Sequence, residues 1–249
     1  MRRCRPLLGT LVEIRVPDGT GEQAIASAFA AIAQVHRLMS AQDKKSDVGR
    51  INRARAGARI RVHPWTRRVL RHARRISVAT GGLFDCCPAA GNSADLEFLP
   101  GHAVRPRRPL KITLDGIAKG FAVDQAVAAL RRAGVASGAV NAGGDLRVFG
   151  REAQPVYARD PRDLQRLVLI GELREAAVAT SAAYFSGTPA IVHPRTRRAK
   201  RSAASVSVAA PDCMTADALT KAVFLDARAA ARAMRRFAAQ AVVLGMRAG

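Results

Sequence analysis

The 249-residue sequence has few aromatic residues: phenylalanine, tyrosine and tryptophan together make up 4% of it. Alanine, valine and leucine must therefore build most of the core, and the chain is long enough to bury a substantial one. Apolar residues account for 49% of the chain, which excludes a disordered polymer. No low-complexity linker, charge break or internal repeat divides the chain, so we predict one domain over residues 1–249.

Long hydrophobic runs are also missing. No stretch of eighteen apolar residues occurs, which argues against a membrane-spanning helix. The first residues, MRRCRPLLGTLVEIRV, pass directly from basic side chains into an alternating pattern, without the apolar segment of a signal peptide. The sequence therefore predicts a cytoplasmic protein with no membrane span.

Cysteine is sparse, and its spacing excludes the usual metal-binding patterns. The adjacent Cys86 and Cys87 suit neither a zinc knuckle nor an easy mutual disulfide, and no CxxC pair occurs. We expect Cys4, Cys86, Cys87 and Cys213 to be free thiols in a reducing compartment.

Acidic residues are scarce, with 19 against 41 basic residues and a formal net charge of +22. Such a surface attracts polyanions, including nucleic acid, anionic lipid and phosphorylated cofactors. The densest arginine group, within residues 67–75, recurs at helical spacing and is typical of a solvated helix face. The chain has no RNA-binding aromatic signature and no basic tail, so we predict no specific nucleic-acid partner. The sequence does not indicate the oligomeric state.

Apolar periodicity predicts helices in the first half and a strand-rich second half, which favours an α+β fold with a mixed or antiparallel sheet flanked by helices. The predicted helices cover residues 22–39, a short segment from 46, then 64–79, 118–133, 214–225 and 228–237. The predicted strands cover residues 9–16, 111–114, 138–141, 146–149, 156–158, 167–170, 176–180, 204–209 and 241–244. Residues 92–109, interrupted by proline and glycine, are predicted to be an irregular surface excursion.

The segment LDGIAKGFAVD, residues 114–124, predicts a strand that passes through a glycine into a helix carrying Lys119 in its first turns. Backbone N–H groups at a helix start, together with a lysine, form a pocket suited to phosphate. The alternative is an ordinary connector, because strand–glycine–helix junctions are common. The NAGGD segment, residues 141–145, permits close backbone approach by a ligand, but it also fits a plain turn between strands.

On a helix, Asp217, Thr220 and Lys221 of the segment ADALTKA would share one face. A carboxylate beside a hydroxyl is a donor set suited to Mg²⁺. An exposed aspartate–lysine pair is the alternative. Asp85 in TGGLFD and His193 in HPRT are candidates for proton transfer, or else local hydrogen-bonding residues in turns.

The order of these segments along the chain is more specific than any one of them. GTLVEIRV, MSAQDKKSDVGRIN, TGGLFD, LDGIAKGFAVD, NAGGD, VATSAAY, HPRT and ADALTKA together resemble the ApbE family of FAD:protein FMN transferases, over residues 8 to 225. The resemblance implies an α+β, T-fold-related domain that binds FAD and Mg²⁺. It implies transfer of FMN from FAD to a threonine or serine of an acceptor protein, with release of AMP. Hydrolysis of FAD to FMN and AMP, or FAD binding without catalysis, are the alternatives.

Carried over by motif, Lys119 would contact FAD near its pyrophosphate. The other predicted FAD contacts are Leu8, Gln42, Leu83, Phe84, Asp85 and Thr113. Metal ligands would be the carbonyl of Gly116 and the carboxylate of Asp217. Asp217 and His193 are the predicted catalytic residues.

Four positions stand out as departures from the family pattern. Thr113 stands where an aspartate is usual, and Lys221 stands where a hydroxyl residue is usual, four residues after the metal aspartate. An ammonium there could replace part of the charge of the cation, or Thr220 could become the ligand. Ala190 takes the place of a histidine, and His193 that of an aspartate.

Overall fold

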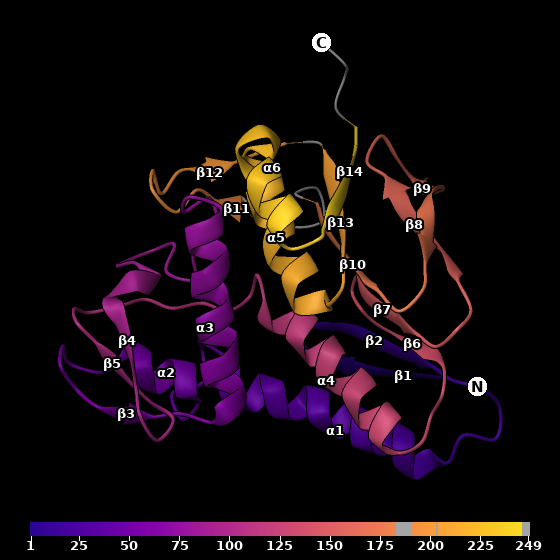
Figure 1. The fold of residues 1–249 in the computed structure, drawn as a ribbon, viewed down its shortest axis with the longest axis horizontal. Helices are drawn as coiled ribbons and strands as arrows, with labels where there is room; N and C mark the ends of the chain where they lie inside the picture. Colours follow the sequence, from indigo (N-terminus) through magenta and orange to yellow (C-terminus); the bar gives the residue numbers. More distant parts are fainter. Residues whose placement is uncertain (183–190, 203, 246–249) are drawn as a thin grey trace.

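The computed structural model describes residues 1–182, 191–202 and 204–245. Its largest element is a seven-stranded antiparallel sheet in the order β1-β2-β6-β7-β10-β13-β14 (Figure 1). The strands are β1 (Arg2–Leu7), β2 (Thr10–Arg15), β6 (Gly138–Ala142), β7 (Asp145–Phe149), β10 (Ala177–Ala182), β13 (Ser205–Ala210) and β14 (Gln240–Leu244). The predicted α+β class with an antiparallel sheet is confirmed.

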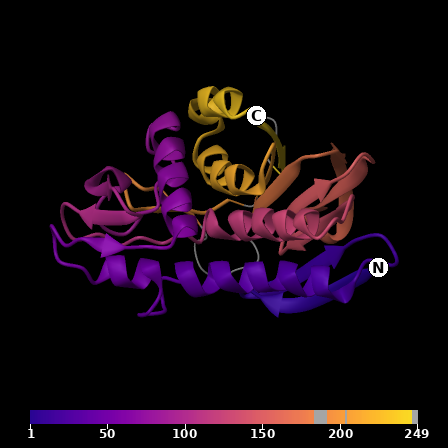
Figure 2. The ribbon, with the colours of Figure 1, turned by 60° about the horizontal axis from the view of Figure 1, so that its bottom comes forward.

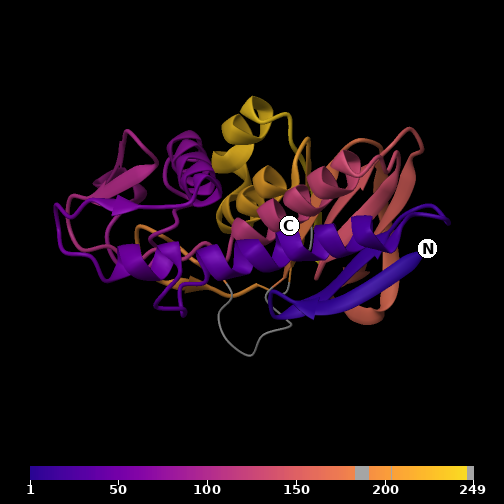
Figure 3. The ribbon, with the colours of Figure 1, turned by 90° about the horizontal axis from the view of Figure 1, so that it is seen from below.

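Helices pack on this sheet, and α1 and α4 lie side by side in the views of Figures 2 and 3. Helix α5 packs against α4 and against strands β10 and β13. The helices are α1 (Glu22–Met39), α2 (Asp47–Asn52), α3 (Pro64–Ala79), α4 (Ala118–Arg132), α5 (Cys213–Leu225) and α6 (Ala227–Arg236). The core between helices and sheet consists mainly of aliphatic side chains, with Phe121 and Phe149 the largest that are fully buried.

Smaller sheets extend the structure at both ends. One contains β3 (Ile60–Arg61), β5 (Ala103–Pro106) and β4 (Leu96–Leu99), preceded by the 3-10 turn η1 (Ser93–Asp95), and lies beside α2 and α3 (Figure 1). The others are the hairpin of β8 (Gln154–Asp160) and β9 (Asp163–Leu173) and the short pair β11 (Ile191–Val192) and β12 (Ala199–Lys200).

The predicted bounds of α1 and α3 are confirmed, because their ends are defined by local chemistry. Pro64 opens α3 at the position where a missing N–H costs nothing, and Gly81 after its end has a φ of 59°. Ser46 caps α2 as predicted, with its Oγ accepting from the N–H of Gly49 at 2.8 Å.

The prediction of an irregular segment at residues 92–109 is wrong, since this region holds the β4–β5 hairpin. Pro100 and Gly101 fall in its turn, where Gly101 and His102 both have positive φ, and Pro106 ends the second strand. The residues that suggested disruption therefore lie at positions that a hairpin tolerates.

The predicted strand at residues 111–114 is also wrong: only an isolated bridge joins Lys111 to Ala90. The backbone of Ile112 is instead held at both ends by the side-chain amide of Asn52, at 2.7 and 2.8 Å. The N–H of Thr113 donates to the carbonyl of Cys86. A side chain and a loop thus replace the expected neighbouring strand.

None of the described helices is long and apolar enough to cross a membrane. The four cysteines are free thiols, as expected, and three of them, Cys86, Cys87 and Cys213, are buried.

Candidate active site

Helices α4 and α5 cap one another. The carboxylate of Asp217 on α5 accepts the N–H of Gly120 in the first turn of α4, at 3.2 Å. The carboxylate of Asp124 on α4 accepts the N–H groups of Cys213 and Met214, at 3.0 and 2.9 Å. These N–H groups have no partner within their own helices, and a negative charge near them is favoured by the helix dipole. The two helices are therefore held at a fixed separation.

Gly120 makes this close approach possible. A Cβ atom at this position would lie 2.2 Å from the carbonyl oxygen of Cys213 and 3.0 Å from the Cβ of Asp217. Only glycine fits such a crossing. The second glycine of the LDGIAKG segment is thus explained by helix packing.

Where the two helices meet the sheet, two lysines lie above two buried aspartates. We call Lys119, Asp145, Asp217 and Lys221 the aspartate–lysine cluster. The Nζ of Lys119 lies 3.5 Å from Oδ2 of Asp145, and the Nζ of Lys221 contacts Oδ1 of Asp217. The aspartate side chains are 1% and 0% exposed, whereas those of Lys119 and Lys221 are 28% and 23% exposed. Solvent therefore meets the ammonium groups, with the carboxylates beneath them.

Burial dominates the electrostatics of Asp145. Burial first, and then the negative charge of Asp217, raise the pKa of this carboxyl to about 8, against the opposing effect of Lys119 and Lys221. The Oδ2 atom of Asp145 is buried without a hydrogen-bond partner, because the 3.5 Å ion pair is too long to be one.

Burial acts in the opposite sense on Lys119, where it lowers the pKa. The nearby carboxylates of Asp145 and Asp217 more than offset this, so the pKa of Lys119 is raised overall and the ammonium stays charged. The accessible side of the aspartate–lysine cluster is consequently cationic.

Thr220 lies directly beneath this cluster and is fully buried. Its hydroxyl donates to the backbone carbonyl of Asp217 at 2.7 Å, and its oxygen lies 2.7 Å from the hydroxyl of Ser181 on β10. The hydroxyl of Thr220 is therefore already engaged in both directions.

Gly116 and Phe84 border the cluster. A Cβ atom at Gly116 would lie 3.3 Å from Cε of Lys221 and 3.5 Å from Cε2 of Phe84. The stem of Lys221 thus lies beside the residue whose carbonyl the sequence predicts to bind metal. Phe84 is buried, while the preceding Leu83 is partly exposed.

The turn between β1 and β2 is linked to the cluster through the NAGGD turn. Leu8 and Gly9 have φ values of 55° and 69°, as a tight two-residue turn requires. The following Thr10 touches the NAGGD turn, because a Cβ at Gly143 would lie 2.5 Å from its hydroxyl. Lys119 lies 3.5 Å from the carbonyl of the same Gly143. The β1–β2 turn, which contains Leu8, and the side chain of Lys119 are therefore both linked to the NAGGD turn.

Asp85 is placed where it organises a loop. Its carboxylate accepts from the hydroxyls of Ser77 and Ser93, at 2.9 and 2.6 Å, and from the N–H of Cys87 at 2.8 Å. It lies close to the thiols of Cys86 and Cys87, but its oxygens are already used by these bonds. Thr113, another predicted FAD contact, donates its hydroxyl to Asp115 at 2.7 Å.

The remaining predicted residues make local contacts. Gln42 accepts a hydrogen bond from the hydroxyl of Ser40 at 3.2 Å. The Nδ1 of His193 accepts the N–H of Arg195 at 3.2 Å within its own turn, and the side chain of Arg195 bonds the carbonyl of Gly81. The HPRT turn is thereby tied to the TGGLFD loop. Ala190 lies outside the described residues.

Sequence reasoning did not single out Asp145 as a site residue, although NAGGD was noted as a motif. An acidic residue at the first position of a buried strand, directly after two glycines, was the available signal. Its meaning depends on burial by α4 and α5, which no local pattern encodes.

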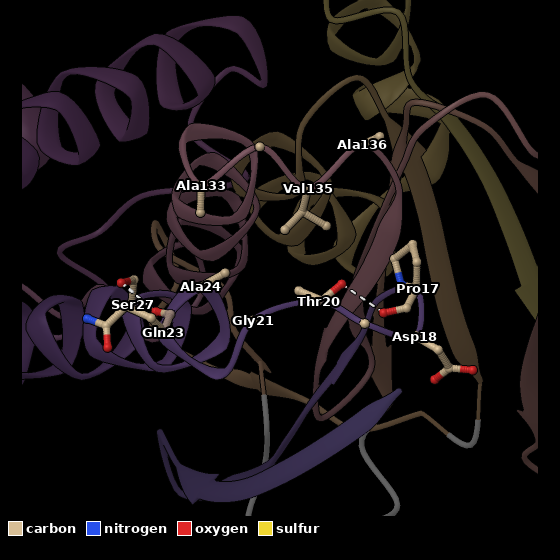
Figure 4. Close-up of a pocket in the computed structure, with 12 residues that line it drawn as sticks. Pro17, Asp18, Thr20, Gly21, Gln23, Ala24, Ser27, Ala133, Val135 and Ala136 are labelled. Carbon is tan, nitrogen blue, oxygen red and sulfur yellow. Dashed lines mark hydrogen bonds between the residues drawn. The ribbon is translucent and has the colours of Figure 1, made fainter.

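A cavity of about 560 Å³ away from the cluster carries little chemistry. It lies between the β2–α1 and α4–β6 connections, and small side chains and backbone line it (Figure 4). Its Asp18 already pairs with the amino terminus at 2.6 Å, and Thr20 donates to the carbonyl of Pro17. No set of ionisable groups converges among its lining residues, which are drawn in Figure 4, so we place the candidate active site at the aspartate–lysine cluster.

Comparison with known proteins gives a consistent result. The family model described as "ApbE family" matches residues 8–96 and 91–244. A curated relative from Rhodobacter capsulatus, named FAD:protein FMN transferase, is 29% identical over 87% of this chain. The chain spans about half the length of that relative, 50%.

Solved structures share the fold. The apo form of the Pseudomonas stutzeri flavinyl transferase ApbE superposes with a TM-score of 0.82 at 22% identity, covering 97% of this chain and 89% of that one. The flavin transferase ApbE from Vibrio cholerae gives 0.83 at 22% identity, with 98% and 92% covered. The ApbE protein of Thermotoga maritima gives 0.85 at 23% identity, with 98% and 93% covered.

Proposed function

This chain belongs to the ApbE family, and on that premise we propose that it transfers FMN from FAD to a threonine or serine hydroxyl of an acceptor protein, releasing AMP. One observation supports placing this reaction at the aspartate–lysine cluster. Two partly exposed lysine side chains pair there with two buried carboxyl groups, where α4, α5 and β7 meet. We also propose that residues 1–249 form one domain, since one large core cluster includes residues from α1 to α6 and from β2 to β13.

A pyrophosphate is the part of FAD that suits such a face. Each phosphate carries a negative charge, and lysine ammonium groups bind phosphate as mobile point charges. The carboxylates hold the lysines in place from below, and their partial neutralisation leaves the outward charge positive. The start of α4, where Lys119 lies, adds the positive end of a helix dipole.

The transfer step needs positioning and charge neutralisation more than covalent chemistry by the protein. The acceptor hydroxyl oxygen forms a bond to the phosphorus of the FMN half. The bond from that phosphorus to the bridging oxygen breaks, and AMP leaves with the electron pair. Lys119 and Lys221 face the charge that gathers on the phosphate oxygens, which is the charge an enzyme must stabilise.

His193 is the proposed acceptor of the hydroxyl proton. Its Nδ1 accepts a backbone N–H of its own turn, so Nδ1 is the ring nitrogen with the free electron pair, and His193 takes the proton there when this 3.2 Å bond opens. Phe84, Leu83 and Asp85 belong to the loop that this turn contacts through Arg195 and Gly81. We propose that this loop lines the flavin nucleotide, with Leu8 and Gln42 as further contacts.

Magnesium is predicted from the sequence, and its donors can be tested for fit. The ammonium of Lys221 contacts the Asp217 carboxylate, and the Cε of Lys221 would lie 3.3 Å from a Cβ at Gly116. The hydroxyl of Thr220 is committed to the backbone and to Ser181. The residues as arranged do not fit a divalent cation, so we derive no step through one.

The experiment is incubation of the protein with FAD and a synthetic peptide library carrying one central threonine, in EDTA and in Mg²⁺. Nucleotides are separated by chromatography and peptides are weighed by mass spectrometry. AMP together with the mass of FMN on peptide supports transfer. AMP with free FMN would replace the proposal by FAD hydrolysis, and bound, unconverted FAD would replace it by flavin binding alone.

A further inference from the structure

The position of Lys221 indicates how the site balances its negative charge. This inference rests on the proposed function. We propose that the ammonium of Lys221 takes the place of a divalent cation in this site, so that turnover of FAD requires no Mg²⁺.

Geometry is the first support. The Nζ of Lys221 contacts Oδ1 of Asp217 and lies 3.1 Å from the backbone carbonyl of the same residue. It thus sits on a carboxylate and a carbonyl oxygen, the oxygen ligands that a hard cation would use. Its Cε would be 3.3 Å from a Cβ at Gly116, so the stem of Lys221 also lies beside the residue whose carbonyl is a predicted ligand.

The balance of charge is the second support. Two ammonium groups, Lys119 and Lys221, face the carboxyl groups of Asp145 and Asp217, so even with both carboxyl groups ionised no negative charge is left for a divalent ion to balance. A cation placed at Asp217 would be a few ångströms from the ammonium of Lys221 in a poorly solvated site, where like charges repel strongly. Binding a metal would require Lys221 to withdraw.

The commitment of nearby donors is the third support. The carboxylate of Asp217 also accepts the N–H of Gly120, which fixes its orientation on α4. Thr220 is fully buried and bonded to the Asp217 carbonyl and to Ser181, so its hydroxyl oxygen has at most one lone pair left for a cation. The side chain of Lys221, by contrast, is 23% exposed, so it can hold Asp217 with two N–H groups and offer the third to a phosphate.

The test uses Mn²⁺ as a spectroscopic probe, because its binding can be measured without any turnover. The free Mn²⁺ signal in electron paramagnetic resonance is followed on titration with wild type, Lys221→Thr, Lys221→Met and the double variant Lys221→Thr with Asp217→Asn. Thermal melting confirms that each is folded, and Lys221→Met removes the ammonium without adding an oxygen.

We expect wild type to leave the Mn²⁺ signal unchanged and Lys221→Thr to gain one site, at least tenfold tighter than Lys221→Met. The double variant should lose it, which assigns the site to Asp217. In EDTA, FAD turnover by wild type should persist, and that of Lys221→Thr should become metal-dependent. An Asp217-dependent Mn²⁺ site in wild type, or none in folded Lys221→Thr, would overturn the proposal.

Failure of the proposed function gives a different pattern. Wild type would then convert no FAD with or without Mg²⁺, whichever variant binds Mn²⁺. Wild-type turnover that requires Mg²⁺ would instead contradict the role of Lys221 and leave the transferase assignment intact.

Discussion

Two buried aspartates do the same structural work on facing helices but differ in what surrounds them. Asp124 caps α5 with both carboxylate oxygens and pairs with one cation, Arg147. Asp217 caps α4 with one oxygen and pairs with Lys221, beside a second carboxylate whose Oδ2 has no hydrogen-bond partner. In the first arrangement both carboxylate oxygens are bonded and a planar guanidinium holds them; the second keeps flexible ammonium groups near solvent. The comparison indicates that a helix-capping aspartate also belongs to a ligand site where the cationic groups beside it can still bind an anion.

The largest expected effect is a loss of stability on changing Asp124. Asp124→Ala removes the cap of α5 and leaves Arg147 without its partner, and breaking a buried ion pair costs about 3–5 kcal/mol. We expect a loss of this order in the free energy of unfolding, measured by urea denaturation, with FAD affinity retained under conditions where the protein is folded. A loss below about 1 kcal/mol would show that Asp124 and its pair with Arg147 do not stabilise the fold.

The matched change on the other side should affect turnover more than stability. Asp217→Ala removes one helix cap, worth about 1 kcal/mol, while the partly exposed Lys221 can turn to water. Because Lys221 then loses its anchor, we expect AMP release from FAD to fall about 100-fold. An equal loss of stability in Asp217→Ala and Asp124→Ala, with turnover preserved, would show that the two aspartates have the same, purely structural role.

The pH dependence of stability should report on Asp145. Its pKa is raised from an ordinary 3.8 to about 8, so between these values the folded protein keeps a proton that the unfolded chain releases. Stability relative to Asp145→Asn should therefore decrease as pH rises from 5 to 8, by up to about 1 kcal/mol per pH unit, and level off above 8. Urea denaturation across this range measures the difference; a pH-independent difference would contradict the burial argument.

The smallest predicted effect concerns one phosphate contact. Lys119→Met should weaken FAD binding about tenfold, the order expected for one charge-assisted interaction. Arg232→Met, on an exposed position of α6, removes the same charge far from the proposed contact and is the matched control. Titration of FAD fluorescence measures both, and equal effects of the two changes would indicate general attraction to a basic surface.

The sequence predicted most helices well, because proline, serine caps and glycine stops are local signals. It did not identify β1, whose Arg2, Arg3 and Arg5 are exposed edge residues without an apolar alternation. Arg2 and Arg3 are balanced by ion pairs with Glu13 and Glu22, contacts that come from β2 and α1. Elements held by distant partners were thus harder to predict than elements with local caps.

The same limit applied to the candidate site. Lys119, Asp217 and Lys221 were found because helical spacing and motif order place them. Asp145 was not singled out, since an aspartate after two glycines is also an ordinary turn residue. Its raised pKa arises from burial and from Asp217, 72 positions later in the numbering, and only the packed helices bring these groups together.

The most direct test of the account compares FAD with riboflavin in EDTA, by fluorescence titration of wild type, Lys119→Met and Arg232→Met. If the aspartate–lysine cluster holds the pyrophosphate, FAD should bind at least tenfold more tightly than riboflavin, and only Lys119→Met should reduce that preference. Equal affinity for the two flavins, or the same loss in both variants, would contradict the central claim that this cluster is the phosphate-binding site.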